Sequence, residues 1–271
     1  METLVICFSC SKEKCSRLIT FEAMEHGISL VIDIGNTRTK IALFDKSEII
    51  ESHSIKGNFS QQLSKLADRY GIPLRTIISK VALDEQELRA ALEPVKTSEI
   101  LFVRSGLRLP IRVLYKTPET LGHDRLSNVC AAWSLYPNRN CLVIDMGTCI
   151  KYDFISAEGT YQGGSISPGL AMRYKSLTRF TTQLPYFKPV DEFPILTGQS
   201  TEGSIRSGVE NGILAELGGI TNRYNELFDQ TLIILTGGDA PRFADKLKSP
   251  IFVAPNLTLT GLKVILDHND Q

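Results

Sequence analysis

The stretch LVIDIGNT at residues 30–37 decides the fold, because it recurs as LVIDMGTC at residues 142–149. Each copy is an apolar run that ends in Asp-x-Gly and leads into a second, alternating run. A buried strand, a tight turn and a returning strand produce this pattern. Asp33 and Asp145 stand 112 positions apart, so we expect two similarly built halves.

The rest of the chain alternates between the strand and helix periods. Strands are expected at residues 40–44, 48–55, 76–81, 100–103, 152–155, 232–236 and 251–254, and helices at residues 61–70, 85–92, 124–136, 241–247 and 257–266. Such alternation favours mixed sheets covered by helices. The fold class is therefore α/β, with a first half at residues 28–138 and a second half at residues 139–271. Three prolines between residues 183 and 197 predict a loop there.

Composition excludes several classes of protein. The chain has 271 residues, and its thirty Lys and Arg residues balance thirty Asp and Glu residues. A net charge of zero argues against a general affinity for nucleic acid or anionic membranes. No apolar run approaches the roughly 18 residues of a membrane span, and Glu2 stands where a signal peptide carries a basic residue. We expect a cytoplasmic protein that binds neither nucleic acid nor membrane.

Residues 1–27 show neither the strand nor the helix period. Cys7, Cys10 and Cys15 have a spacing that suggests zinc, but His26 is the one nearby fourth ligand. The favoured interpretation is a loosely ordered N-terminal extension without a role in the chemistry.

The first Asp-x-Gly turn has the residue types of a phosphate site. Asp33 at the end of a buried strand, followed by the Gly35 turn, puts a carboxylate and several backbone N–H groups at one end of the sheet. With Lys40, this arrangement suits a Mg²⁺-bound polyphosphate. The alternative is a plain hairpin in which Asp and Gly only satisfy the turn geometry. The duplication favours the functional interpretation, because two such turns facing each other would clamp a nucleotide.

A second candidate site is the segment Gly122–Arg125 at the start of a predicted helix. Asp124 there is either a helix-capping residue or the base that accepts a substrate hydroxyl proton, and its position alone does not separate the two. Arg125 would hold an anionic group of the substrate. His123 has the more suitable unperturbed pKa, but phosphoryl transfer needs only a weak base, so His123 is interpreted as a neighbour.

Glycine-rich segments mark three further positions. Residues 163–169 and 236–240 are expected to be turns, where glycine lets a ligand approach the backbone or simply connects two elements. The predicted helix at residues 202–217 contains three glycines, which indicates close approach of another backbone. A subunit interface would explain that approach.

Taken together, five motifs resemble those of the type III pantothenate kinase family. They are Asp33-x-Gly-Asn-Thr-x-x-Lys40, Gly122-x-Asp-Arg125, Asp145-x-Gly-Thr148, Gly163-Gly-x-Ile-x-Pro-Gly169 and Thr236-Gly-Gly-Asp-Ala240. Each motif alone is weak, but five in the family's order are specific, and they span residues 28–271.

The resemblance implies a duplicated ribonuclease H-like fold of the actin-like ATPase superfamily, working as a homodimer. It also implies transfer of the ATP γ-phosphoryl group to the terminal hydroxyl of pantothenate, the first step toward coenzyme A. Mg²⁺ and a monovalent cation, K⁺ or NH₄⁺, would be required.

Site residues carry over by position. ATP would be bound by Asp33, Ile34, Gly35, Asn36, Thr37, Arg38, Thr39, Lys40, Thr148, Gly237 and Gly238, with Asp33 reaching Mg²⁺ through water. Pantothenate would be bound by Tyr115, Gly122, His123, Asp124 and Arg125, and by Thr201 of the partner subunit. Asp124 would be the catalytic proton acceptor, and Asp145 would hold the monovalent cation.

The sequence departs from the family pattern at two places. Position 123 is His where the family has Ala, and Cys149-Ile150-Lys151 replaces the usual Ala-Thr-Thr after the second Asp-x-Gly-Thr. Lys151 would offset the lost hydroxyls only if its side chain turned inward, which strand alternation does not settle.

Two other functions are compatible with the same motifs. One is a kinase for another small hydroxy acid, and the other is a nucleotide-dependent transcription accessory factor of the same family. The neutral charge balance and the presence of Asp33, Asp124 and Arg125 favour catalysis.

Overall fold

The computed structural model describes residues 5–7, 28–70, 74–80, 85–93, 95, 97–104, 106–247 and 250–270. The expected N-terminal extension lies outside these residues, apart from Val5–Cys7, which form a strand that the sequence did not predict. The chain divides into two compact units, one of residues 28–135 and 257–270 and the other of residues 136–256 with Val5–Cys7. None of the helices in the described residues has the length and apolarity of a membrane span.

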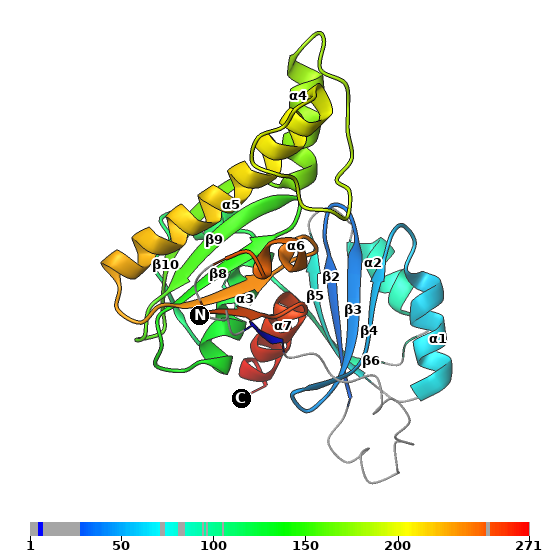
Figure 1. Cartoon of the computed structure of the whole chain (residues 1–271). Helices are drawn as coiled ribbons and strands as arrows, with labels where there is room; N and C mark the ends of the chain where they lie inside the picture. The colour runs from blue at the N-terminus through cyan, green and yellow to red at the C-terminus, as the bar shows by residue number, and fades with distance from the viewer. Residues whose placement is uncertain are drawn as a thin grey trace. The chain divides into compact units, whose positions relative to one another are not determined.

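The unit that begins at residue 28 contains the first predicted hairpin (Figure 1). Its elements are β2 (Ser29–Ile34), β3 (Thr39–Asp45), β4 (Glu48–Ile55), α1 (Ser60–Tyr70), β5 (Leu74–Lys80), α2 (Glu85–Leu92), β6 (Thr97–Phe102), β7 (Arg112–Val113), a 3₁₀ helix at Pro118–Thr120, α3 (His123–Leu135) and α7 (Leu257–His268). The predicted elements of this half are present to within three residues at each end.

The other unit contains the second hairpin. Its elements are β1 (Val5–Cys7), β8 (Cys141–Met146), β9 (Cys149–Ile155), β10 (Thr160–Pro168), α4 (Leu170–Phe180), α5 (Thr201–Leu227), β11 (Leu232–Thr236), α6 (Ala240–Ala244) and β12 (Ile251–Val253). The predicted turn at residues 163–169 is wrong, because residues 163–168 form the end of β10. Gly164 permits this pairing, since a Cβ there would lie 1.7 Å from the carbonyl oxygen of Tyr152 on β9.

The two sheets have the same topology, as the repeat predicts. One sheet has the order β4-β3-β2-β5-β6, and the other contains β10-β9-β8-β11-β12 in the corresponding order. In each, the first strand of the hairpin is antiparallel to the second and parallel to the strand that follows the crossover. The expected α/β fold of two related mixed sheets flanked by helices is therefore confirmed.

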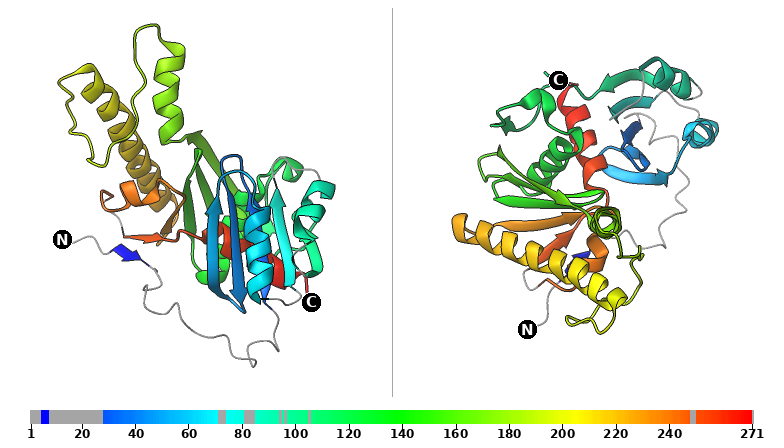
Figure 2. Two further views of the ribbon diagram at one scale, coloured as in Figure 1. Left: turned by 90° about the vertical axis from the view of Figure 1, so that its right-hand side faces the viewer. Right: turned by 90° about the horizontal axis from the view of Figure 1, so that it is seen from above.

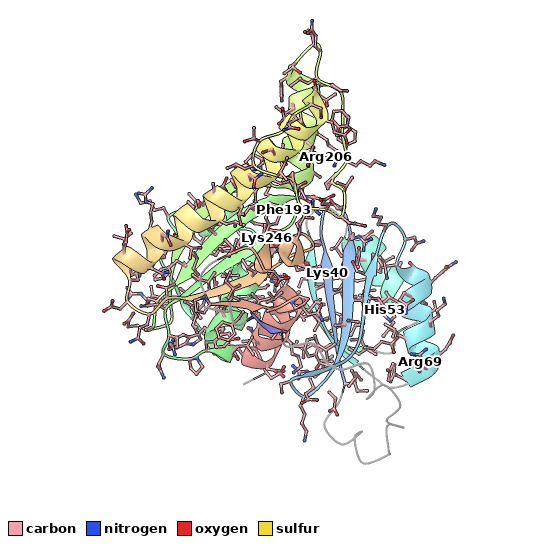
Figure 3. All side chains as sticks on the ribbon, in the orientation of Figure 1. Lys40, His53, Arg69, Phe193, Arg206 and Lys246 are labelled. Carbon is pink, nitrogen blue, oxygen red and sulfur yellow. The ribbon has the colours of Figure 1, made fainter. Side chains whose placement is uncertain are left out.

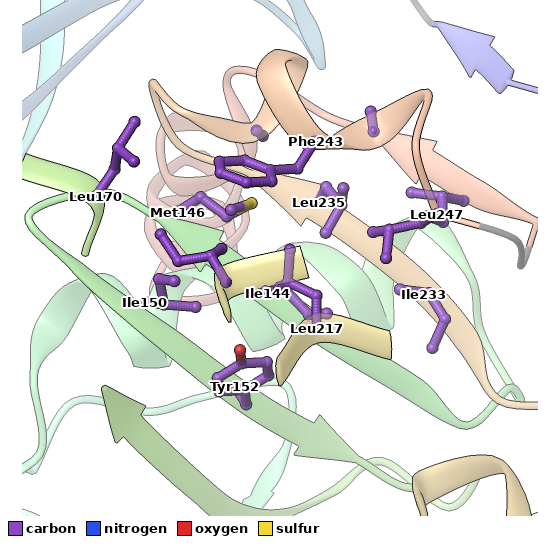
Figure 4. Packing of buried hydrophobic residues seen from close by; sticks show 14 of the residues in the cluster. Ile144, Met146, Ile150, Tyr152, Leu170, Leu217, Ile233, Leu235, Phe243 and Leu247 are labelled. Carbon is purple, nitrogen blue, oxygen red and sulfur yellow. The ribbon is translucent and has the colours of Figure 1, made fainter. Parts of the chain in front are cut away.

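Strand alternation decides which residues face the site. In β2 and β3, every second side chain joins a core cluster with α1 and α2, which includes Leu30, Ile32, Ile34, Ile41, Leu43, Leu63, Leu66, Leu88 and Leu92. In β8 and β9, the matching set (Leu142, Ile144, Met146, Ile150, Tyr152 and Phe154) packs with α5 and α6 (Figure 4). Asp33, Lys40, Asp145 and Lys151 are out of phase with these sets, so they lie on the opposite face of each sheet.

The C-terminal helix α7 packs in the unit of the first hairpin, whereas the sequence grouped residues 257–266 with the second half. It contacts β2 and β5, and it lies along α3 (Figure 2). Thr258 Oγ1 donates a buried hydrogen bond of 2.9 Å to Asn128 Oδ1 on α3. The backbones approach so closely that a Cβ at Gly261 would lie 1.8 Å from the carbonyl oxygen of Ser127.

Helices α4 and α5 extend beyond their sheet, joined by an irregular segment at residues 181–200 (Figures 1 and 2). The predicted loop at residues 183–197 lies within this segment. Its backbone is fixed, because the carbonyl of Leu196 accepts a 2.5 Å hydrogen bond from Ser207 of α5. The Lys246 ammonium also lies 4.7 Å from the ring centroid of Phe193 (Figure 3).

Replacing Gly261 by Ala is expected to lower the free energy of unfolding by about 2–3 kcal/mol, because the methyl group forces α7 away from α3. Denaturant unfolding of the purified variant measures this change. Gly218→Ala on α5 is the matched control, since a Cβ there meets nothing within 4 Å and Ala is the better helix former. An unchanged midpoint for Gly261→Ala would contradict the close packing.

Candidate active site

The first hairpin gathers most of the residues expected to bind nucleotide. Asp33 on β2 lies directly opposite Lys40 on β3, and residues that face each other across an antiparallel pair share one face of the sheet. Between them the chain turns through residues 35–38, with the Gly35 N–H donating to the Arg38 carbonyl at 3.1 Å. Figure 3 labels Lys40 on β3. The hairpin therefore presents a carboxylate, an ammonium group and an exposed turn together.

Three of the predicted nucleotide ligands have other contacts. The Ile34 side chain belongs to the core cluster and Thr39 is buried, so Ile34 can offer only its backbone to a ligand. The Arg38 guanidinium donates a 3.0 Å hydrogen bond to Ser54 on β4. Asn36 and Thr37 in the turn are exposed, as is Arg38.

The second hairpin is built alike but has one residue fewer in its turn. Asp145 on β8 lies opposite Lys151 on β9, six positions later, whereas Lys40 follows Asp33 by seven. The Gly147 N–H accordingly closes the turn on the Cys149 carbonyl, at 3.1 Å. The register thus makes Lys151 the counterpart of Lys40, although the sequence repeat aligns Lys40 with Tyr152.

Lys151 turns toward Asp145, which settles the direction that alternation left open. Its Nζ lies 2.6 Å from Asp145 Oδ2, and the two side chains are only 14% and 12% exposed. Two like unit charges 4 Å apart repel by about 4 kcal/mol at an effective dielectric constant of 20. With Lys151 in this position, the residues at Asp145 do not fit a bound K⁺ or NH₄⁺ ion.

Backbone segments converge on the second turn because glycine permits it. A Cβ at Gly169 would lie 2.5 Å from the carbonyl oxygens of Gly147 and Thr148, and the Gly169 N–H donates to the Thr148 carbonyl at 3.2 Å. Gly237, with a φ of +93°, comes equally close to Met146 and would place a Cβ 2.7 Å from Asp145 Oδ1. Gly238 and Thr148 are exposed beside this packing. The motif glycines at 147, 169 and 237 therefore assemble one structure around Asp145.

The start of α3 holds the residues expected at the second substrate. Asp124 Oδ1 accepts a 2.8 Å hydrogen bond from the Arg125 N–H, and a Cβ at Gly122 would lie 2.6 Å from the same oxygen. Arg125 is 4% exposed, and its Nη1 donates to the Tyr115 hydroxyl at 3.3 Å. The guanidinium carbon also lies 5.6 Å from the Tyr115 ring centroid. Tyr115, Asp124 and Arg125 thus form a connected cluster.

His123 stands beside Asp124 in the first turn of α3. Burial lowers the pKa of its imidazole below the ordinary value of 6.5, although the negative charge of Asp124 acts in the opposite direction. The ring is therefore neutral near pH 7. The neutral imidazole is the form that accepts a proton, so His123 stays chemically able to act as a base beside Asp124.

Thr201 is separate from the other expected site residues of its unit. It opens α5 at the end that extends beyond the sheet beside α4, and it is exposed (Figure 1). Across the described residues, no group of three or more His, Cys, Asp or Glu side chains is placed to hold a metal ion.

Two acids on α5 that the sequence did not single out hold the second unit together. Glu216 accepts hydrogen bonds from Tyr152 of β9 at 2.7 Å and from Ser167 of β10 at 2.6 Å, and it pairs with Arg173 of α4. Glu210 is fully buried and pairs with Arg242 of α6 at 2.6 Å. Acidic residues on the apolar face of a helix were the signal available in the sequence.

The family model and the relatives that match this chain carry the same description. Residues 29–223 match the family model described as type III pantothenate kinase. A type III pantothenate kinase from Phocaeicola vulgatus is 43% identical over 244 residues, covering 90% of this chain and all of that protein. Another from Christiangramia forsetii is 41% identical over 243 residues, covering 89% of this chain and 99% of that protein.

Two solved structures share the fold. A candidate Baf family transcriptional activator from Campylobacter jejuni has a TM-score of 0.55 at 23% identity, covering 89% of this chain and 98% of its own. A candidate N-acetylmannosamine kinase from Listeria monocytogenes has a TM-score of 0.53 at 13% identity, covering 90% and 100%. These likenesses agree with the duplicated α/β fold of two related mixed sheets flanked by helices.

NMR titration of the His123 ring protons is expected to give a pKa below 6.5, because burial disfavours the imidazolium. Asp124→Asn should lower this pKa further, since it removes the neighbouring charge that favours protonation. Because the folded state disfavours the charged ring, the His123 contribution to the free energy of unfolding is fully present above pH 6.5. It is lost as the pH falls from 6.5, the pKa in the unfolded chain, toward the lower pKa of the folded protein. A pKa at or above 6.5 in the folded protein would contradict the described environment.

Proposed function

The chain belongs to the type III pantothenate kinase family, and we propose that its reaction, the ATP-dependent phosphorylation of pantothenate, uses Asp124 as the proton acceptor. This reaction is the first step of coenzyme A biosynthesis. The observation that carries the proposal is the cluster at the start of α3. There a carboxylate fixed by the Arg125 N–H adjoins a buried guanidinium held by Tyr115.

Asp124 is suited to accept a hydroxyl proton. The 2.8 Å bond from the Arg125 N–H orients the carboxylate, and a Cβ at Gly122 would push the same oxygen out of this position. Phosphoryl transfer passes through a loose transition state, so the attacking hydroxyl needs positioning more than a strong base. A carboxylate is sufficient for that task, and His123 is not needed.

Arg125 and Tyr115 would bind pantothenate. Pantothenate carries a carboxylate, and the planar guanidinium fork of Arg125 pairs with such a group through two parallel hydrogen bonds. Tyr115 fixes the guanidinium from the side and supports it with its ring face. His123, in place of Ala, lies at the edge of this site and leaves less room there.

The first hairpin would bind the phosphates of ATP. Mg²⁺ is held in proteins by one or two carboxylates together with waters and phosphate oxygens, and Asp33 at the end of β2 fits that donor set. When bound, Mg²⁺ would neutralise charge on the phosphates. Lys40, opposite Asp33, and the N–H groups and side chains of the exposed turn at residues 35–38 would contact the phosphate oxygens. Thr148, Gly237 and Gly238 would lie beside the nucleotide.

We further propose a homodimer formed through α4, α5 and the segment between them. Phe180, Ile195 and Leu196 are 83%, 68% and 79% exposed, and covering them with a second copy of the chain would remove apolar surface from water. Ser207 and Asn211 of α5 bind the carbonyls beneath Ile195 and Leu196, so these side chains are presented from a fixed backbone. Thr201, at the same end of α5, would then reach the pantothenate bound by the other subunit.

A cytoplasmic location follows from the proposed reaction, because ATP and the coenzyme A pathway are found there. Cys130, Cys141 and Cys149 are free thiols, which suits a reducing compartment.

Purified protein with MgATP and pantothenate is expected to form phosphopantothenate, and Asp124→Asn should lower kcat by about 10²–10⁴-fold. MgATP affinity, measured by calorimetry, should remain unchanged, because Asp124 would contact the acceptor hydroxyl and not the nucleotide. Asp68→Asn, an exposed acid on α1, is the matched control and should keep the wild-type rate. Unchanged turnover in Asp124→Asn would assign this residue to helix capping alone.

The double substitution Phe180→Glu and Leu196→Glu is expected to convert the dimer to a monomer, because it places charges on the apolar surface. Light scattering after size exclusion measures the mass, and circular dichroism checks the fold. Leu227→Glu, at the other end of α5 and 72% exposed, should leave the dimer intact. A wild-type protein that is monomeric at assay concentration would contradict the proposal.

A further inference from the structure

In the second hairpin, the Lys151 ammonium group lies beside Asp145, where the resemblance implies a bound K⁺ or NH₄⁺ ion. Lys151 Nζ lies 2.6 Å from Asp145 Oδ2, and both side chains are largely buried. The register places the two residues directly opposite each other on one face of the sheet, so the lysine reaches the carboxylate by extending across the strand pair.

The carboxylate is also enclosed on its other side. A Cβ at Gly237 would lie 2.7 Å from Asp145 Oδ1, and a Cβ at Gly147 would lie 3.5 Å from it. Oδ2 faces the ammonium group, and Oδ1 faces the backbone of the two glycine turns. A monovalent cation at this carboxylate would have to displace Lys151 or share the site with a like charge.

A lysine ammonium can do what such a cation does. It carries the same single charge, it resembles NH₄⁺ in chemistry, and its three N–H groups can bind a carboxylate and a phosphate oxygen together. Thr148 is exposed at the turn, so the ammonium supplies the charge without covering this residue of the Asp-x-Gly-Thr motif.

We propose that the ammonium of Lys151 takes the place of the monovalent cation at Asp145, so that this kinase works without K⁺ or NH₄⁺. The proposal rests on the proposed function of the second hairpin as part of the nucleotide site. It replaces the expected role of Asp145 as a cation ligand with that of a carboxylate that positions Lys151.

The first test compares initial rates in buffers that contain only tetramethylammonium, with K⁺, NH₄⁺ or Na⁺ added at constant ionic strength. ATP and pantothenate are supplied as salts free of alkali metal. The wild-type rate is expected to agree within about twofold in all buffers, because the charge is already in place. A rise of about tenfold or more on adding K⁺ would overturn the proposal.

Lys151→Thr supplies the second test, because it restores the residue type that the family usually has here. This variant is expected to lose about tenfold or more of its rate in tetramethylammonium and to recover most of it in K⁺ or NH₄⁺. Lys65→Thr, which changes an exposed lysine on α1, is the control and should show no cation dependence. A variant that stays inactive in every buffer while keeping its thermal midpoint would contradict the exchange of ammonium for cation.

MgATP binding measured by calorimetry separates this proposal from the kinase reaction itself. The wild-type dissociation constant should be the same in tetramethylammonium and in K⁺, and that of Lys151→Thr should fall when K⁺ is added. If pantothenate is not phosphorylated in any buffer, the proposed function fails, and the binding data still decide the role of Lys151. A wild-type affinity for MgATP that depends on K⁺ would overturn the proposed role of Lys151.

Discussion

Both halves of the molecule depend on one constraint, which is a carboxylate placed at the end of a buried strand and therefore in need of a positive neighbour. Asp33 and Asp145 occupy this position in sheets of the same topology. A partly buried carboxylate is costly unless it is paired or hydrogen-bonded. In each hairpin, the antiparallel register supplies a lysine on the same face, directly across the pair. In the second hairpin this lysine serves as the counter-charge, with Lys151 Nζ 2.6 Å from Asp145 Oδ2.

Close backbone packing around the second carboxylate explains glycines that otherwise look like flexible turns. Gly169 and Gly237 bring the start of α4 and the end of β11 against the turn that follows Asp145. Gly164 likewise allows close backbone contact inside β10, where a side chain would collide with β9. Close contact excludes a side chain at all three positions, and Gly237 also has a φ of +93° that favours glycine. The glycines at positions 169 and 237 of the motifs are thus explained by the backbone that packs against the turn after Asp145.

The sequence predicted features that depend on local order and missed those that depend on distant contacts. Both hairpins, the paired aspartates and the strand–helix alternation follow from apolar periods within a few residues. The place of α7 in the unit of the first hairpin does not follow from such local patterns. It depends on the packing of Gly261 against Ser127, which are far apart in the chain. The direction of Lys151 was also beyond the sequence. A turn shortened by one residue shifts the register, and the repeat taken at constant offset aligns Lys40 with Tyr152.

That single-residue difference gives the two hairpins different geometry. The longer turn at residues 35–38 is exposed and offers several polar groups beside Asp33 and Lys40. The shorter one is enclosed by glycine contacts, and its lysine is held against Asp145 at 2.6 Å. An enclosed pair gives a charge of fixed position, and an exposed turn gives groups that can adapt to phosphate oxygens. For a reaction whose barrier is lowered mainly by positioning and by fixed charge, one duplicated unit can supply both functions.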